Sequence, residues 1–425
     1  MYHETPVSRL STMRETGVSR YSFTGEHIMN AAVPISQEIA WIGVNDRETH
    51  LFEALWPLPE GISYNAYMIC DEKVALIDTV KINSALSYLE KISAMLPAGK
   101  KVDYLIINHM EPDHSGSIKV LLQQFPDLQI VGNKKTMGFL EGFYDITENL
   151  HVVKDGDVLD LGKHKLRFYL TPMVHWPETM MTYDTVDKVL FSGDAFGGFG
   201  TLDGGIFDDE VNIAFYKDEI RRYFSNIVGK FGKPVLNAIQ KLQNLDIRVV
   251  APTHGPIWRQ DPAHIVEDYR RWSAHETEIG VVIAYGSMYG NTEKMADTIA
   301  RGLAEAGIEN VRVLNVSKTH VSYIINDIWR FKGLILGSCT YNLGLFPPMD
   351  SLIRHLENKL LTNRVLGIFG SYSWSGGGVS ALKAFGEQSN WKVVEPVIEA
   401  QYAPHAEEME QCAALARNMA NEINT

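Results

Sequence analysis

Seven side chains able to bind metal ions follow predicted β-strands in the first 260 residues of the chain. Four fall within six positions, directly after the apolar run Leu105–Ile107: His109, Glu111, Asp113 and His114. Three more each come just after another predicted strand: His175, Asp194 and His254. Loops at the ends of neighbouring strands can converge on one point, so we expect these side chains to form one site.

The size of this set predicts two metal ions. One ion usually takes three or four protein ligands, so four histidines and three carboxylates are too many for one ion and suit two. A carboxylate can bridge two cations about 3.5–4 Å apart, and Asp194, alone on its loop, is the best bridging candidate. A lone residue at a strand end is usually a helix cap or a solvated loop residue, but four metal-capable side chains in six positions are not. Other histidines lack such neighbours and are interpreted as ordinary surface residues: His151, His164 and His264.

A second type of chemistry is indicated after the predicted strand Val281–Ala284. The chain there reads Gly286-Ser287-Met288-Tyr289-Gly290-Asn291-Thr292 and then enters a predicted helix. Backbone N–H groups and hydroxyls at a helix N-terminus bind phosphate well. The lysine of a Walker loop is missing, and no G-x-G-x-x-G motif opens a helix after a strand. The pattern therefore suits one terminal phosphate.

Two further strand ends in the same half carry loops rich in small and aromatic residues. These are Gly337-Ser338-Cys339-Thr340-Tyr341-Asn342-Leu343-Gly344 and Gly370-Ser371-Tyr372-Ser373-Trp374-Ser375-Gly376-Gly377. One such loop would be no more than a Gly/Ser turn. Three of them, at the first, third and fourth strands of one sheet, indicate a ligand site at the C-terminal strand ends.

The elements that must position these residues divide the chain in two. From Gly280 onward, five apolar strands alternate with amphipathic helices, which predicts a doubly wound parallel sheet of the α/β class. Before residue 278, short strands with turn signals dominate, such as one expected over Tyr64–Cys70. The polar segment Arg270–Glu278 is the expected linker. We expect an N-terminal extension over 1–35, a first domain over 36–277 and a second over 278–425.

Composition excludes several classes of function. The 425-residue chain has a net charge of −13 and no basic tract, which makes nucleic acid and anionic membranes poor partners. No apolar run approaches the roughly 18 residues of a membrane span. Its three cysteines contain no CxxC pair, which excludes cysteine-ligated zinc, rubredoxin and iron–sulfur modules. Arg9, Arg14 and Arg20 among serines suggest a transit peptide, but we favour a polar extension and a cytoplasmic protein over an organelle-matrix one.

The H-x-E-x-D-H pattern resembles the flavodiiron branch of the metallo-β-lactamase superfamily, whose first domain is an αββα sandwich. In the zinc hydrolases of that superfamily the second ligand position is a histidine, whereas here it is Glu111; a harder, anionic ligand favours iron. The resemblance implies one iron held by His109, Glu111 and His175, and another held by Asp113, His114 and His254. Asp194 would bridge them.

The second half resembles flavodoxin, which implies FMN. The phosphate would lie on Ser287, Tyr289, Asn291 and Thr292, and the ring between the two later loops. The full expected FMN set is Ser287, Met288, Tyr289, Gly290, Asn291, Thr292, Ser338, Thr340, Tyr341, Asn342, Gly344, Ser371, Tyr372, Ser373, Trp374 and Gly376.

Resemblance to flavodiiron proteins implies an oxidoreductase that reduces O2 to water, NO to N2O, or both. Because the chain ends soon after its last predicted helix, we expect electrons from a separate rubredoxin-type or F420-type donor. The family also implies a head-to-tail homodimer, or a tetramer built from such dimers. The alternative is a zinc-dependent hydrolase with a flavodoxin-like electron-carrier domain.

Overall fold

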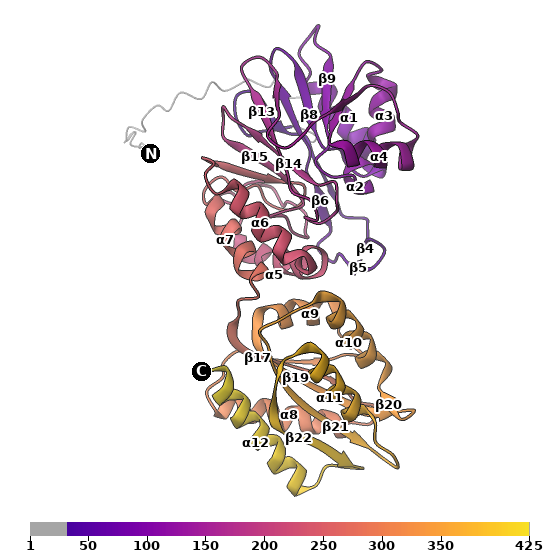
Figure 1. Cartoon of the computed structure of the whole chain (residues 1–425), viewed down its shortest axis with the longest axis vertical. Helices are drawn as coiled ribbons and strands as arrows, with labels where there is room; N and C mark the ends of the chain where they lie inside the picture. Colours follow the sequence, from indigo (N-terminus) through magenta and orange to yellow (C-terminus); the bar gives the residue numbers. More distant parts are fainter. Residues whose placement is uncertain (1–31, 425) are drawn as a thin grey trace, which may run out of the picture.

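The computed structural model describes residues 32–424, which form two domains stacked end to end (Figure 1). The interpretation of the first residues as a polar extension or transit peptide lies outside the described part of the chain. The first domain contains two sheets with helices on their outer faces, and the second contains a single parallel sheet with helices on both faces.

Two stacked sheets form the first domain. The larger has the strand order β1-β2-β7-β8-β9-β10-β11, and the smaller has the order β12-β13-β14-β15-β16. The strands of the larger sheet are β1 (Val33–Pro34), β2 (Ile39–Trp41), β7 (Tyr67–Cys70), β8 (Val74–Ile77), β9 (Val102–Ile106), β10 (Gln129–Gly132) and β11 (Leu150–Val152). Those of the smaller sheet are β12 (Val158–Asp160), β13 (Lys165–Leu170), β14 (Met180–Asp184), β15 (Val189–Gly193) and β16 (Val249–Pro252). Two short hairpin-like pairs add β3 (Val44–Asp46) with β6 (Ile62–Tyr64), and β4 (Leu51–Phe52) with β5 (Trp56–Pro57).

Alternation along the strands explains why these sheets stack. On β8, Ala75 and Ile77 belong to one buried apolar cluster, together with Phe168 and Phe191 of the smaller sheet. Leu76, between them, belongs to a different cluster on the outer face. Successive side chains of a strand point to opposite faces, so β8 is apolar on both faces because it is covered on both.

Helices cover the outer faces of this sandwich. They are α1 (Ala85–Met95), α2 (Pro112–Ser115), α3 (Ile118–Gln124), α4 (Lys134–Tyr144), α5 (Ile213–Tyr223), α6 (Gly232–Leu242) and α7 (Pro262–Ser273), with the short turns η2 (Ile82–Ser84), η3 (Phe224–Val228) and η4 (Gly229–Phe231). In Figure 1, α1, α3 and α4 lie beside the larger sheet, and α5, α6 and α7 lie toward the second domain.

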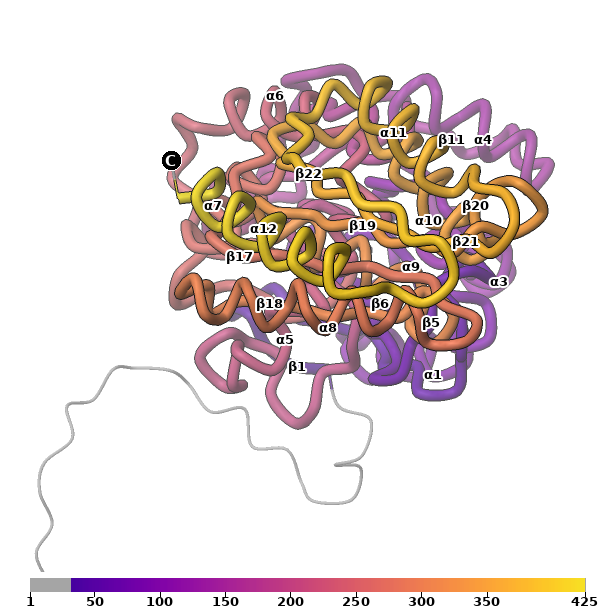
Figure 2. The backbone as a smooth tube through the Cα atoms, turned by 90° about the horizontal axis from the view of Figure 1, so that it is seen from below, coloured from indigo at the N-terminus to yellow at the C-terminus, as the bar shows by residue number. Residues whose placement is uncertain are grey.

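The second domain is a doubly wound α/β sheet, as the sequence predicts. Its strands are β17 (Glu278–Gly286), β18 (Val311–Asn315), β19 (Phe331–Tyr341), β21 (Val365–Tyr372) and β22 (Lys392–Gln401), in the order β18-β17-β19-β21-β22, and β20 (Gly344–Leu345) pairs with the end of β19. Its helices are α8 (Asn291–Glu305), α9 (Val321–Arg330), α10 (Pro347–Lys359), α11 (Gly378–Ser389) and α12 (Ala406–Ile423). Figure 2 shows α8 and α12 side by side on one face of the sheet.

Two expectations about local structure are wrong. The polar segment Arg270–Glu278 is not a linker throughout, because α7 continues to Ser273 and leaves only 274–277 between the domains. Its charges instead form ion pairs on the surface of the helix and just after it, such as Arg270 with Glu267 and Glu276. The run Tyr64–Cys70 is not one strand either, since it is divided between β6 and β7.

The contact between the domains is built around Trp329 of α9, which is fully buried. Its indole Nε1 donates to the backbone oxygen of Trp272 over 3.0 Å. A Cβ on Gly229 would meet this ring at 2.6 Å, so glycine is required at that position. Polar bonds surround the ring: Asn226 Nδ2 donates to Ser322 O over 3.2 Å, and Lys359 Nζ donates to Asn226 O over 2.5 Å.

His275, in the linker, predicts an acid-sensitive step in unfolding. Its Nδ1 accepts a hydrogen bond from Thr362 N over 3.1 Å. Burial, together with the charge of Arg364, lowers the pKa of His275 to about 4. The imidazole of His275 therefore takes up a proton near pH 6.5 in the unfolded chain and only near pH 4 in the folded chain. The contribution of neutral His275 to the free energy of unfolding is complete above pH 6.5 and is lost as the pH falls toward 4.

We therefore expect the thermal midpoint of the wild-type protein to fall more steeply between pH 6.5 and 4 than that of His275→Gln, which carries no titrating group there. His151→Gln is the matched control, because His151 is exposed. Parallel pH profiles for wild type and His275→Gln would contradict this expectation.

Candidate metal and flavin sites

The seven metal-capable side chains meet at one end of the sandwich. His109 and Glu111 follow β9, Asp113 and His114 lie on α2, His175 precedes β14, Asp194 follows β15 and His254 follows β16. All seven side chains are buried. They form two groups within ligand-binding distance, one of His109, Glu111, His175 and Asp194, and one of Asp113, His114 and His254.

The first group surrounds a point between four ligand atoms. Glu111 Oε2 lies 3.2 Å from His109 Nε2 and 3.1 Å from His175 Nε2. Asp194 Oδ2 lies 3.1 Å from His175 Nε2 and 3.5 Å from His109 Nε2. Ligands about 2.0–2.2 Å from one ion are separated by about 3.3–3.5 Å when they are arranged as a tetrahedron. The spacing therefore fits a single first-row metal ion.

The second group uses the other oxygen of Asp194. Asp194 Oδ1 lies 3.0 Å from His114 Nε2 and 3.8 Å from His254 Nε2. Asp113 Oδ2 lies 3.3 Å from each of these two nitrogens. The two oxygens of one carboxylate are thus divided between the groups, which is the arrangement of a bridging ligand.

The polar atoms of the second group show that a cation fits there. Both carboxylate oxygens of Asp113 and the Nε2 atoms of His114 and His254 are buried and have no hydrogen-bond partner. Buried polar atoms without partners are rare in native proteins and call for an ion or a ligand. A metal ion would satisfy all of them together.

Electrostatics favour a cation in both groups. Burial alone would lower the pKa of His114, but the charges of Asp113 and Asp194 outweigh it and raise this pKa to about 9. Burial also acts to lower the pKa of His175, and hydrogen bonds with Asp194 and Glu111 raise it to about 9. The carboxylates therefore attract positive charge, and protons compete with metal ions for these nitrogens.

Neighbouring groups fix the ligand orientations. Ser63 O accepts a hydrogen bond from His254 Nδ1 over 2.8 Å, which leaves the Nε2 lone pair directed at the second group. Thr253 Oγ1 donates to Asp194 Oδ1 over 2.6 Å. Sequence reasoning did not identify either partner, since a backbone oxygen and a threonine carry no metal-binding signature.

Glu178 is the most important residue that sequence reasoning missed. It is buried, and its Oε1 accepts from His109 Nδ1 over 2.7 Å and from Met110 N over 2.9 Å. This bond sets the tautomer of His109, so that Nε2 faces the first group. A carboxylate three positions after His175 was the available signal in the sequence.

Replacing Glu178 with glutamine should weaken iron retention about 10- to 100-fold, because the charge that orients His109 and raises its basicity is lost. The measurement is the iron remaining per chain after equilibration against increasing chelator. Glu148→Gln, at an exposed position, is the matched control. Equal iron retention by the two variants would show that Glu178 does not position His109.

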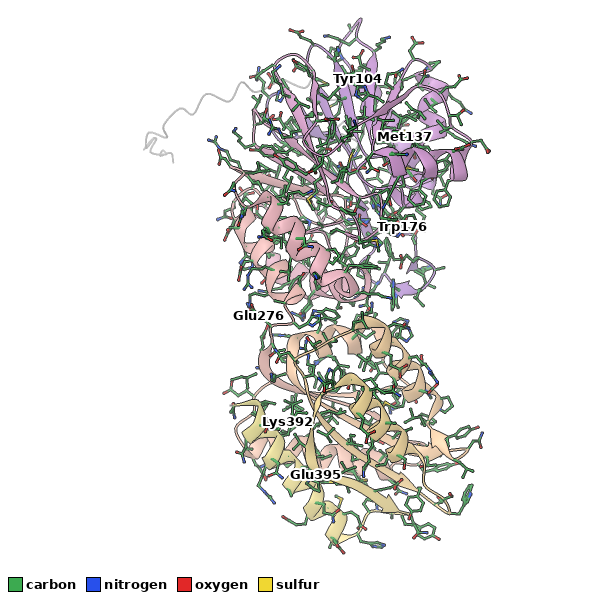
Figure 3. The ribbon with its side chains drawn as sticks, in the orientation of Figure 1. Tyr104, Met137, Trp176, Glu276, Lys392 and Glu395 are labelled. Carbon is green, nitrogen blue, oxygen red and sulfur yellow. The ribbon has the colours of Figure 1, made fainter. Side chains whose placement is uncertain are left out.

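Aromatic rings enclose the metal-capable groups. The ring of Trp176 lies 5.1 Å from that of His109, and the ring of Tyr223 lies 5.5 Å from that of His254. Phe52 and Tyr64 also contact His254, at 5.6 and 5.7 Å. These side chains exclude water around the ligands, which strengthens their electrostatic interactions. Figure 3 labels Trp176 in the first domain.

The interpretation of His164 as an ordinary surface histidine is wrong. His164 has 0% relative exposure and lies among Glu38, Asp184 and Asp187. Its neighbours come from segments far apart in the sequence, so no local pattern indicated them.

The three loops expected to bind flavin also converge, at the C-terminal ends of β17, β19 and β21. Thr292 Oγ1 on α8 lies 2.9 Å from Ser371 Oγ near the end of β21, and both residues are buried. Gly378 N donates to Thr340 Oγ1 over 3.0 Å, which joins the third loop to the second. Gly377 has a φ of 150°, and a Cβ there would collide with the oxygen of Leu343. Glycine is therefore required where these loops approach each other.

The first loop has the features of a phosphate cradle. Gly290, with a φ of 90°, precedes the first turn of α8, and its N–H donates to Ser287 Oγ over 3.0 Å. The first N–H groups of a helix have no partner within the helix and carry partial positive charge. Together with the hydroxyl of Thr292, they fit a dianionic phosphate.

Each of the three loops also carries an exposed aromatic residue. Tyr289 is 90% exposed and Trp374 is 87% exposed, while Tyr341 of the middle loop is 44% exposed. Large aromatic side chains on a surface indicate a binding site when they gather around a groove. Cys339, in the same middle loop, is buried.

Thr292→Ala should weaken FMN binding roughly 10- to 150-fold, because a charge-assisted hydrogen bond to the phosphate contributes roughly 1.5–3 kcal/mol. The measurement is the dissociation constant from flavin fluorescence. Thr298→Ala is the control, since Thr298 lies about two turns later on α8 and is partly exposed, and its hydroxyl donates to Lys294 O within the helix. Unchanged affinity in Thr292→Ala would contradict the phosphate assignment.

Within residues 32–424, no helix combines the length and the apolar composition needed to cross a membrane.

Comparison with known proteins finds relatives for both halves. Residues 62–255 match the family described as ODP family beta lactamase, and residues 283–415 match flavodoxin. The chain is 34% identical over 397 residues to a Klebsiella pneumoniae protein named anaerobic nitric oxide reductase flavorubredoxin, covering 92% of this chain and 82% of that protein.

Two solved structures are similar over nearly the whole chain. The rubredoxin oxygen:oxidoreductase of Desulfovibrio gigas has a TM-score of 0.88 and 29% identity, covering 92% of this chain and 98% of that one. The flavodiiron protein of Giardia intestinalis has a TM-score of 0.89 and 26% identity, covering 94% and 98%.

Proposed function

We infer that this chain, which belongs to the flavodiiron proteins, reduces O2 to water, NO to N2O, or both. It is an oxidoreductase whose cofactors are FMN and a non-haem diiron centre. The observation that supports this function best is the division of the two Asp194 oxygens between two groups of metal-capable side chains.

We assign the iron ligands as the resemblance implies. His109, Glu111 and His175 would hold one iron, and Asp113, His114 and His254 would hold the other. Asp194 would be a ligand shared by both. When bound, the irons and FMN together supply the electrons and a binding position for a diatomic gas.

The protein side chains contribute charge, orientation and exclusion of water. Three carboxylates among four histidines offset the positive charge of the metal site, and Glu178 keeps the Nε2 of His109 directed inward. Trp176 and Tyr223 pack against the rings of His109 and His254, so that only small molecules can reach the metal site. A dry, preorganised site of this kind stabilises anionic oxygen species more strongly than water does.

The arrangement of the domains supports a head-to-tail dimer. In Figure 1, β20 lies far from α2 of the same chain, with α9 and α10 between them. β17 follows the linker, and its eight residue steps place Gly286 about 26 Å from Glu278. We propose that the flavin loops of one protomer lie against the metal site of its partner, and that two such dimers can form a tetramer.

Electrons come from a separate donor, of rubredoxin or F420 type. The exposed aromatic rim formed by Tyr289, Tyr341 and Trp374 provides an apolar contact around the flavin loops.

The test follows O2 and NO consumption by one iron- and FMN-loaded, chemically reduced preparation. Oxygen reduction takes up four electrons and four protons per O2 and gives two water molecules. Nitric oxide reduction takes up two electrons and two protons for two NO and gives N2O and water. Faster turnover of one gas identifies it as the preferred substrate, and consumption of neither gas would contradict the proposal in favour of the zinc-hydrolase alternative.

A further inference from the structure

A second cluster of metal-capable side chains lies at the opposite end of the first domain from the seven ligands. Its members are Glu38 before β2, His164 between β12 and β13, and Asp187 in the turn between β14 and β15. One ligand atom from each lies within 4.8 Å of the others. Since β14 starts beside His175 and ends at Asp184, its five residues separate the two sites by about 15 Å.

Three atoms face one another here without hydrogen-bond partners. They are Glu38 Oε2, His164 Nε2 and Asp187 Oδ2, and all three are buried. His164 itself has 0% relative exposure, and its Nε2 lies 3.6 Å from Glu38 Oε2. Lone pairs without partners at such a distance repel one another unless positive charge lies between them.

The second nitrogen of His164 already has a partner. Nδ1 lies 3.1 Å from Oδ1 of Asp184, which is fully buried, and the other oxygen of Asp184 accepts from Asp187 N over 2.7 Å. A histidine that donates one ring N–H to a carboxylate presents its other nitrogen as a lone pair, which is the usual arrangement behind a metal ligand. The tautomer that satisfies Asp184 therefore directs the lone pair of Nε2 into the cluster.

The charge of the cluster also calls for a dication. Glu38, Asp184 and Asp187 contribute three negative charges, and Lys163 contributes one positive charge through Glu38 Oε1 at 2.9 Å. That contact leaves Glu38 Oε2 free. Glu38 and Asp187 are partly exposed, which gives an ion a route from solvent.

We propose that Glu38, His164 and Asp187 bind one divalent cation of the zinc type, with water as the fourth ligand. One nitrogen and two carboxylate oxygens suit Zn²⁺, and the 3.6 Å separation is close to the roughly 3.3–3.5 Å between ligands of a tetrahedral site. Through Glu38, the ion joins the start of β2 in the larger sheet to two turns of the smaller sheet. Its role is structural, and it is independent of the proposed gas reduction.

The test measures zinc uptake by the full chain with its irons and FMN in place. After equilibration with increasing Zn²⁺ and removal of free ions, zinc, iron and FMN are determined per chain. We expect one zinc per wild-type chain in addition to two irons, and a zinc affinity at least tenfold lower in His164→Gln. His264→Gln is the matched control, since His264 lies at the surface with a single carboxylate 3.5 Å away. Its zinc uptake should equal that of wild type.

A second variant covers the case in which His164→Gln does not fold. Asp187→Asn changes a partly exposed turn residue and should also lose the zinc while keeping two irons, FMN and gas consumption. Zinc should raise the thermal midpoint of wild type and not that of either variant. Absence of zinc uptake by wild type would show that a proton on His164 fills this space instead. Equal uptake by wild type and His164→Gln, or uptake only with loss of iron, would also overturn the proposal.

Discussion

Asp194→Asn should remove iron from both positions and lower gas reduction by at least roughly 100-fold. Its two carboxylate oxygens lie 3.1 Å from His175 Nε2 and 3.0 Å from His114 Nε2, so no other residue belongs to both groups. Asparagine keeps the size of the side chain but offers one neutral oxygen, which cannot bridge as an anion. Loss of a residue that only orients a ligand lowers metal affinity by about 10- to 100-fold. Loss of a ligand shared by both ions should lower it further.

The measurements for this variant are iron per chain and the initial rate of gas consumption. FMN per chain should stay at the wild-type value, because the flavin loops belong to the other domain; this separates a local loss of metal from misfolding. Asp246→Asn is the matched control, with a carboxylate at the surface. Two irons per chain and normal turnover in Asp194→Asn would rule out the bridging role.

Trp329→Ala should destabilise the contact between the domains by about 3–5 kcal/mol, the usual cost of truncating a buried aromatic side chain. The indole is completely buried and lies 5.7 Å from the ring of Phe224. Its removal leaves a cavity beside Gly229, and the backbone oxygen of Trp272 loses one donor and keeps the bond from His275 N. Hydrogen bonds between the domains, such as that from Asn226 Nδ2 to Ser322 O, would then be exposed to water.

We expect this variant to unfold in two separate thermal transitions and to be cleaved faster by protease within residues 274–277. Leu86→Ala is the control, because Leu86 lies on α1, away from this contact, and is 72% exposed, so its loss removes little packing. A single transition at the wild-type temperature for Trp329→Ala would show that the interface does not depend on this ring.

Much of the second domain follows from sequence because its signals are local. Apolar runs such as Val281–Ala284 are buried strands, and the structure extends β17 on both sides of that run. The strands continue into the Gly/Ser loops, because the ends of buried parallel strands still pair with their neighbours. The helix predicted after Thr292 begins two residues earlier, at Asn291, which follows Gly290 in a left-handed conformation.

The metal-capable residues were also detectable, because His109 to His114 concentrate four donors in one short loop. The sequence could not reveal groups that act only after folding. Glu178 becomes a partner of His109 across 69 positions, and His164 meets Glu38 across more than 120. The interface around Trp329 was missed for the same reason, since a tryptophan in an apolar helix face looks like any core residue.

The most direct test of the central claim is X-ray diffraction from crystals of the iron-loaded protein, measured on both sides of the iron absorption edge. The account predicts two iron peaks about 3.5–4 Å apart, one on each side of Asp194, with His109, Glu111 and His175 around one and Asp113, His114 and His254 around the other. A single iron peak, or two peaks that do not bind the two oxygens of Asp194, would contradict it.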